Sequence, residues 1–103
     1  MKLLILDGAV MEAAEAAIWY ELHRRGLGAE FTEELRLTEQ RICDWPEMWP
    51  RMDFYTGQHD IRRCFLNRRF PYRLIYWRRP DEIIILAVAH MRRPPLYWLE
   101  RLS

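Results

Sequence analysis

The segment IRRCFLNRRFPYRLIYWRRPDEIIILAVAH, residues 61–90, decides the fold. It contains three runs of apolar and aromatic residues, at 61–66, 72–78 and 83–90, with proline and charged residues between them. In the second run, neighbouring side chains divide between two faces, as in a strand. The third run is apolar on both faces, which is typical of a central strand. Because short turns join the runs, we predict an antiparallel meander of three strands.

A short apolar run and a helical segment begin the chain. Residues 2–6 (KLLIL) predict a short buried strand, and Asp7 is suited to cap the helix after it. Residues 9–25 are rich in Ala, Glu and Leu without Pro or Gly, which predicts that helix. Its apolar side chains recur at helical spacing and give an apolar stripe, which normally faces a core: Met11, Ala14, Ile18 and Leu22.

A second helix is predicted over residues 29–42. Gly26 and Gly28 break the first helix, and so short a connection predicts an antiparallel helical hairpin. One side of the second helix is apolar: Leu27, Phe31, Leu35, Thr38 and Ile42. Residues 44–60 contain two prolines, a glycine and four aromatic residues without a sustained period, which predicts a long loop packed on the body.

These elements together predict one α+β domain over residues 1–103. Its order is an N-terminal strand, a helical hairpin and a three-stranded antiparallel meander, with the helices packed on one face of the sheet. The chain is half hydrophobic and 14% aromatic, which excludes a disordered protein.

No segment predicts export, membrane insertion or metal binding. Residues 2–6 are too short for a signal peptide, and the longest later apolar run, residues 83–89, is far below the roughly 20 residues that span a bilayer. We therefore expect a cytoplasmic protein without a membrane partner. Cys43 and Cys64 then predict a reduced pair, and the three histidines form no metal-ligand spacing with them. We expect neither a metal nor a cofactor.

Charge is distributed unevenly along the chain. The formal net charge is +1, but residues 1–60 carry −6 and residues 61–103 carry +7. Every cation after Lys2 is arginine, whose planar guanidinium matches phosphate and carboxylate groups. This pattern predicts a basic face for nucleic acid or for an acidic partner, the alternative being solvated arginines along a sheet edge.

The chain contains three motifs: AEAAIWYE (residues 14–21), RRFPYRLIYW (residues 68–77) and ILAVAHMRRPPLYW (residues 85–98). Together they resemble the RelE/ParE superfamily of toxins from bacterial type II toxin–antitoxin systems. RRFPYRLIYW, residues 68–77, resembles the arginine-F-P-Y-strand segment of these toxins. ILAVAHMRRPPLYW, residues 85–98, resembles their last strand, with the H-x-x-R pattern at His90 and Arg93. AEAAIWYE, residues 14–21, resembles their first helix. The order and spacing of the three motifs carry the resemblance over nearly the whole chain.

The resemblance implies an antitoxin, usually acidic where it contacts the toxin, and a toxin–antitoxin hetero-oligomer. It leaves the target open between two kinds of toxin. ParE-like members inhibit DNA gyrase by binding it, whereas RelE-like members cleave mRNA in the ribosome; a silent toxin kept for complex formation is a third alternative. For a binding toxin we predict these partner-binding residues: Arg62, Arg73, Arg78, Arg92, Arg93 and Trp98.

For a nuclease, the catalytic candidates are Arg62 or Arg63, His90, Arg93 and Tyr97. Arginine would neutralise the phosphate, and histidine or tyrosine would move protons at the 2′-hydroxyl and the leaving oxygen. His90 has a structural alternative, in which it ties down the turn after its strand by one hydrogen bond to backbone.

The absence of lysine after Lys2 favours the binding toxin over the nuclease. Any lysine-based version of the nuclease site is missing, and arginine is a poor proton donor.

Overall fold

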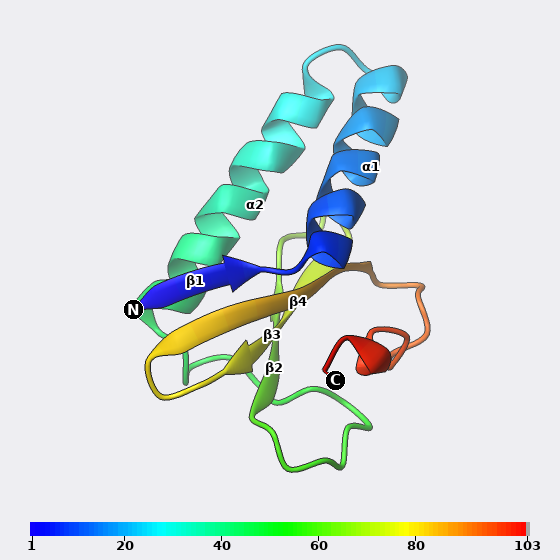
Figure 1. Ribbon diagram of the computed structural model, residues 1–103. Coiled ribbons are helices and arrows are strands. Elements are labelled where there is room, and N and C mark those ends of the chain that lie inside the picture. Colours follow the sequence, from blue (N-terminus) through cyan, green and yellow to red (C-terminus); the bar gives the residue numbers. More distant parts are fainter. Residues whose placement is uncertain (103) are drawn as a thin grey trace.

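The computed structural model describes residues 1–102; Ser103, the last residue of the predicted domain, lies outside them. Figure 1 shows a helical hairpin that crosses one face of a sheet and projects beyond it. The elements are β1 (Lys2–Ile5), α1 (Asp7–His23), α2 (Leu27–Asp44), β2 (Ile61–Phe65), β3 (Tyr72–Arg78), β4 (Glu82–His90) and the 3-10 helix η1 (Leu99–Leu102).

The four strands form one mixed sheet in the order β1-β4-β3-β2. Strands β2, β3 and β4 are the predicted antiparallel meander, with a register shift between Ile75 and Tyr76. Strand β1 adds to β4 in parallel, with Lys2 opposite Glu82. Residues 83–89 are all buried, which confirms that β4 is a central strand.

The helical hairpin covers one face of the sheet, as predicted. The predicted apolar side of α2 is confirmed, because Phe31, Leu35, Thr38 and Ile42 are all buried. They belong to a core that also contains Leu74, with Tyr20 from α1. Within residues 1–102, no helix is long and apolar enough to cross a membrane.

The opposite face of the sheet is covered by the loop between α2 and β2 and by the C-terminal segment. Met52 from the loop and Trp98 from the C-terminal segment pack there against Ile75 of β3. Packing of the loop is thus confirmed, although Trp45 and Phe54 remain on its surface. Because the loop and the C-terminal segment cover this face, the centre of the sheet is buried on both sides.

The cysteines are unpaired, as predicted. Cys43 is half-buried and Cys64 is buried, and neither forms a disulfide. Burial raises the pKa of the Cys64 thiol to about 11. Cys64 therefore stays protonated near neutral pH and behaves as a small core residue.

The start of the chain differs from the prediction in two details. Strand β1 lies at the edge of the sheet, and Leu4 and Ile5 are exposed instead of buried. Asp7 is the first residue of α1, while Leu6 occupies the cap position without a side-chain hydrogen bond. The pairing of β1 with β4 carries the chain directly into the helix and leaves no turn for a capping side chain.

The predicted stripe on α1 lies on the wrong side of the helix for a core. Met11, Ile18 and Leu22 face solvent, whereas the buried residues of the helix are Ala9, Ala16 and Tyr20. Helix α1 therefore has two apolar sides. The side with alanines faces β4, because small side chains let the helix approach the strand closely.

Candidate functional site

Arg62 of β2 is held inside the fold rather than on an open basic face. Its Nε donates to Asp60 at 2.9 Å. Its Nη1 donates to the backbone carbonyls of Glu47 at 2.9 Å and Trp49 at 2.8 Å. Only 14% of the side chain is exposed, so Arg62 fastens the loop to the sheet and offers little surface to a partner.

The other strand arginines are paired in the same way with carboxylates of the loop. Arg63 donates to Asp53 at 3.0 Å, and Arg73 lies 3.6 Å from the same carboxylate with 10% of its side chain exposed. Arg78 forms ion pairs with Glu47 and Asp60.

The predicted basic face on the strands is therefore largely neutralised within the chain. The acidic part of the sequence folds over the basic part. Partner-binding by Arg62, Arg73 or Arg78 would require these internal pairs to break.

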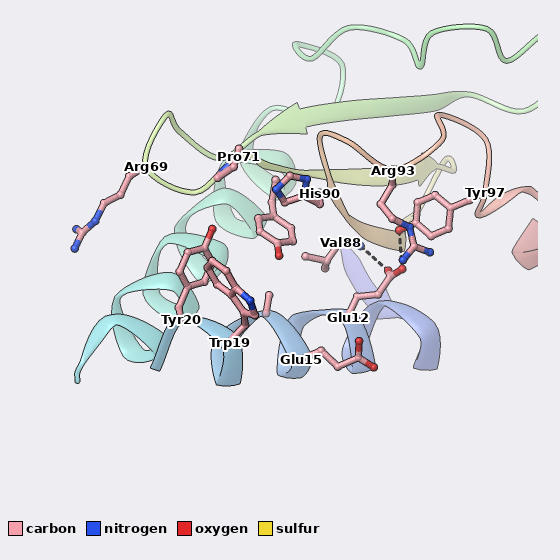
Figure 2. Close-up of a pocket in the computed structure, with 12 residues that line it drawn as sticks. Glu12, Glu15, Trp19, Tyr20, Arg69, Pro71, Val88, His90, Arg93 and Tyr97 are labelled. Atoms are coloured by element: carbon pink, nitrogen blue, oxygen red, sulfur yellow. Dashed lines mark hydrogen bonds between the residues drawn. The ribbon is translucent and has the colours of Figure 1, made fainter. Parts of the chain in front are cut away.

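A pocket of about 620 Å³ opens between α1 and the end of β4. It brings together three of the predicted catalytic residues, His90, Arg93 and Tyr97, while Arg62 and Arg63 lie elsewhere on β2. Figure 2 shows these three across the pocket from side chains of α1. The sequence did not indicate the residues that complete its lining: Glu12, Glu15, Ala16, Trp19, Tyr20, Arg69, Pro71, Tyr72 and Val88.

His90 anchors the turn that follows β4. Its Nδ1 accepts the backbone N–H of Arg92 at 3.0 Å, and its carbonyl accepts the N–H of Arg93 at 3.0 Å. Its ring meets the ring of Tyr72 edge-on at 5.1 Å. The structural alternative predicted for His90 is thus present. With Nδ1 engaged as an acceptor, the neutral ring carries its proton on Nε2.

Tyr97 is held protonated in the wall of the pocket. Its hydroxyl donates to Glu12 at 2.6 Å, and the guanidinium of Arg93 lies 4.0 Å from the centre of its ring. Burial and then the hydrogen bond to Glu12 raise the pKa of Tyr97 above its usual range. Because its proton is already donated to Glu12, Tyr97 is not placed to protonate a leaving group.

Glu12 organises this side of the pocket. Besides Tyr97, its carboxylate accepts the backbone N–H of Val88 at 3.0 Å and two hydrogen bonds from Arg101, at 3.0 and 3.1 Å. Gly8 makes room for Arg101, because a Cβ there would lie 2.8 Å from the guanidinium carbon. Glu12 thus joins α1, β4 and the C-terminal segment. The sequence does not predict this role, because a glutamate in a helical segment is usually exposed to solvent.

Four exposed arginines lie at the end of the sheet where β3 begins and β4 ends, in the turns before β3 and after β4. The two turns are adjacent, because the N–H of Met91 donates to the carbonyl of Pro71 at 2.9 Å. We call these arginines the basic rim: Arg68, Arg69, Arg92 and Arg93. One of them is already paired, since Arg69 forms an ion pair with Glu30 at 2.6 Å.

Trp98 is a core residue and not a surface contact. It is fully buried, and its ring nitrogen donates to the carbonyl of Pro95 at 2.7 Å. The partner-binding role predicted for Trp98 is thus replaced by packing on the sheet. Two prolines in succession turn the chain back after β4, which brings this ring over the strands.

Comparison with solved structures finds the same architecture in another chain. It comes from a structure described as the chromosomal ParDE TA system from P. aeruginosa, and the TM-score is 0.64. The match covers 87% of this chain and 95% of that chain, at 15% sequence identity. The two chains share a fold.

Comparisons of sequence find no relative of this chain. No family model matches the chain. No curated protein matches it. The α+β fold predicted from residues 61–90 is thus supported by a solved structure, while sequence similarity identifies no family.

The pocket is better suited to binding than to proton transfer. Arg93 and the Nε2–H of His90 can donate to an anionic or polar group, and Trp19 and Tyr72 supply flat apolar surface. The carboxylate next to Tyr97, that of Glu12, already accepts four hydrogen bonds. A general base must have a free lone pair directed at its substrate, and Glu12 has its lone pairs engaged.

Proposed function

We propose that the protein is the cytoplasmic toxin of a type II toxin–antitoxin system of the RelE/ParE kind. It inhibits growth by binding an essential target, DNA gyrase, and a cognate acidic antitoxin neutralises it in a hetero-oligomer. The likeness in fold to a chain of a ParDE system supports the toxin–antitoxin role. The donated proton of Tyr97 and the engaged carboxylate of Glu12 support binding over catalysis.

A specific observation favours a second candidate, a ribosome-dependent mRNA endoribonuclease. His90, Arg93 and Tyr97 converge on one pocket although only His90 lies on a strand. That pocket could hold a phosphate against Arg93. The deciding experiment adds the purified protein in parallel to a gyrase supercoiling assay and to a cell-free translation assay in which mRNA cleavage is followed. Inhibition of supercoiling with intact mRNA supports the proposal, and translation-dependent cleavage contradicts it.

Substitution of His90 and Arg93 separates the two candidates within the pocket. For a binding toxin, we expect His90→Gln to retain inhibition, because glutamine can still accept a hydrogen bond from the turn. Arg93→Ala should weaken binding to the target or antitoxin by about 2 kcal/mol or more, as for a central arginine contact. Inhibition titrations of both variants, with thermal melts as a check on folding, measure these effects.

A nuclease would give the opposite result for His90→Gln. Loss of an acid–base group costs about 10²–10⁴ in rate, so mRNA cleavage would collapse while antitoxin binding persists. A folded His90→Gln variant that has lost an RNA-cleaving activity of the wild type would overturn the binding proposal.

Association with the antitoxin should depend on salt through the basic rim. We expect the association rate to fall markedly as salt rises, because the Debye length shortens from about 10 Å at 0.1 M to about 3 Å at 1 M. Stopped-flow mixing with the cognate antitoxin measures the rate. Arg92→Glu should slow association. Arg79→Glu, in the turn at the opposite end of the sheet, is the control for a distant change of charge, and it is melted first because Arg79 pairs with Glu82 at 3.5 Å.

A further inference from the structure

Two tyrosine hydroxyls in the pocket between α1 and β4 have no use within the fold. Tyr20 comes from α1 and Tyr72 from the start of β3, and both line the pocket; we call them the tyrosine pair. Among residues 1–102, neither hydroxyl forms a hydrogen bond. Only 7% of Tyr20 is exposed, and a polar group on so buried a residue normally has a partner. The two hydroxyls are therefore available to a ligand.

Aromatic packing holds the tyrosine pair in place. The ring of Tyr20 lies against the rings of Phe31 and Phe70, with 5.3 and 4.9 Å between the ring centres. The ring of Tyr72 lies 5.2 Å from Phe31 and 6.2 Å from Tyr20. Figure 2 shows the hydroxyl of Tyr20 directed from α1 toward the side of the pocket that holds His90. Because the rings are fixed before a ligand binds, binding costs less conformational entropy.

The other end of the pocket carries an unpaired cation. The guanidinium of Arg93 lies 4.0 Å from the centre of the Tyr97 ring, and within the described residues it forms no ion pair and no hydrogen bond. Along α1 the lining extends from Glu12, which binds Tyr97, to Tyr20, eight residues later, or about 12 Å at the rise of a helix. Figure 2 shows His90 between these two ends. We call this elongated pocket the slot.

Both ends of the slot require hydrogen-bond acceptors, and one acceptor must be negative. Burial raises the pKa of Tyr20 and of Tyr72, and their proximity raises that of Tyr20 further, so both hydroxyls keep the proton that they can donate. The neutral ring of His90 adds its Nε2–H between them and Arg93. The free guanidinium of Arg93 is best matched by a carboxylate or phosphate oxygen.

The charges of the lining favour an acidic peptide over a nucleic acid. Arg93 belongs both to the slot and to the basic rim, so an acidic segment attracted by the rim is led to it. Glu15 also lines the slot, exposed and without an ion pair in the part of the chain that the structure describes. It would repel the successive phosphates of a nucleic acid. An extended peptide advances about 3.3 Å per residue, so three or four residues span the slot.

We propose that the slot binds an extended segment of the antitoxin, with an acidic side chain on Arg93 and a hydrogen-bond acceptor on the tyrosine pair. The tyrosine pair thereby determines which segment fits, because an apolar group at that end would leave both hydroxyls without an acceptor. The identity of the peptide as the antitoxin rests on the proposed function, whereas the preference for an acidic peptide rests on the slot alone.

Removal of one hydroxyl tests the tyrosine pair. Tyr20→Phe and Tyr72→Phe keep the ring, and each should weaken binding of the cognate antitoxin about ten-fold in isothermal titration calorimetry. Both variants should melt close to the wild type, because the hydroxyls have no partner in the fold to lose. Tyr55→Phe is the matched control, since Tyr55 packs on the opposite face of the sheet, where its hydroxyl accepts the N–H of His59 at 3.3 Å. It should bind the antitoxin as the wild type does.

A short peptide tests the slot without the antitoxin. The probe is acetyl-Glu-Val-Glu-amide, titrated into the full chain while the backbone amide signals of His90 and Arg93 are followed by NMR. We expect the acidic peptide to shift both signals and the neutral acetyl-Gln-Val-Gln-amide to shift them much less, because it brings no charge to Arg93. Tyr20→Phe should weaken the response to the acidic peptide, and inorganic phosphate is titrated for comparison.

Three outcomes overturn the proposal. The Tyr20→Phe and Tyr72→Phe variants bind the antitoxin as tightly as the wild type, or the acidic peptide leaves the signals of His90 and Arg93 unchanged, or phosphate alone shifts them. Any of these results leaves the toxin role standing. If the protein neither inhibits gyrase nor cleaves mRNA but the acidic peptide shifts both signals, the proposed function fails and the acidic-peptide site is supported.

Discussion

Ile85→Asp is expected to abolish cooperative folding and, with it, every activity of the protein. Ile85 is fully buried in the middle of β4, where it pairs with Ile5 of β1 on one side and Tyr76 of β3 on the other. The substitution removes a packed side chain, at about 2–5 kcal/mol, and buries an unpaired carboxylate, at several more. The sum is comparable to the whole stability of a small domain, about 5–15 kcal/mol.

Circular dichroism during heating measures this effect, and Ile18→Asp is the matched control. It makes the same chemical change on the solvent side of α1, where 60% of Ile18 is exposed, so it should melt close to the wild type. A cooperative melt of Ile85→Asp near that of the wild type would show that β4 is not the central strand in solution.

Glu12→Ala is expected to have the second largest effect, about 3–5 kcal/mol of lost stability. Its removal leaves the guanidinium of Arg101, the hydroxyl of Tyr97 and the N–H of Val88 without their shared acceptor. The carboxylate and the guanidinium are only 15% and 23% exposed, so water replaces the lost hydrogen bonds poorly. Urea unfolding should show a lower midpoint with an unchanged slope.

Glu15→Ala is the control for Glu12→Ala, since Glu15 is exposed on the same helix, one turn later. It should change stability by no more than a few tenths of a kcal/mol. The double variant Glu12→Ala, Arg101→Ala should be less destabilised than the two single effects combined, because the two side chains contact each other. Additive losses would mean that Glu12 and Arg101 act separately.

The strands could be predicted from sequence because their signals are local. The boundaries of β3 follow from alternation between two faces and from the prolines beside it, and the structure gives the same residues, 72–78. The central place of β4 follows from an uninterrupted apolar run. Both signals depend on neighbours in the sequence and require no knowledge of distant contacts.

The inward side of α1 could not be predicted in the same way. A helix with one apolar side can face the core in only one orientation. Helix α1 has two apolar sides, and the periodicity of its sequence does not indicate which of them is buried. The structure buries Ala9 and Ala16 and exposes Ile18 because close approach to β4 outweighs the larger apolar area of the side with Met11, Ile18 and Leu22. The choice depends on β4, the strand that α1 meets, which begins 59 residues after α1 ends.

The sequence predicted only part of the candidate site, because some of its residues are close together in the sequence and others meet only in the folded chain. His90 is the last residue of β4, and Arg93 and Tyr97 follow it within seven positions, so the turn after the strand brings the three together. The ion pairs of Arg62 and Arg63 depend on the positions of carboxylates in the loop between α2 and β2, and that loop has no periodic pattern from which its conformation could be predicted. Glu12 joins the site through contacts with residues 76 to 89 positions away, which no local pattern reports.

The parallel pairing of β1 with β4 has a consequence for synthesis of the chain. Lys2 lies opposite Glu82, so the first strand made waits for the last strand before it acquires a neighbour. Until then its apolar side chains stay without a sheet, and contacts of such high sequence separation slow folding. The nascent sheet can therefore close only after β4, residues 82–90, has left the ribosome.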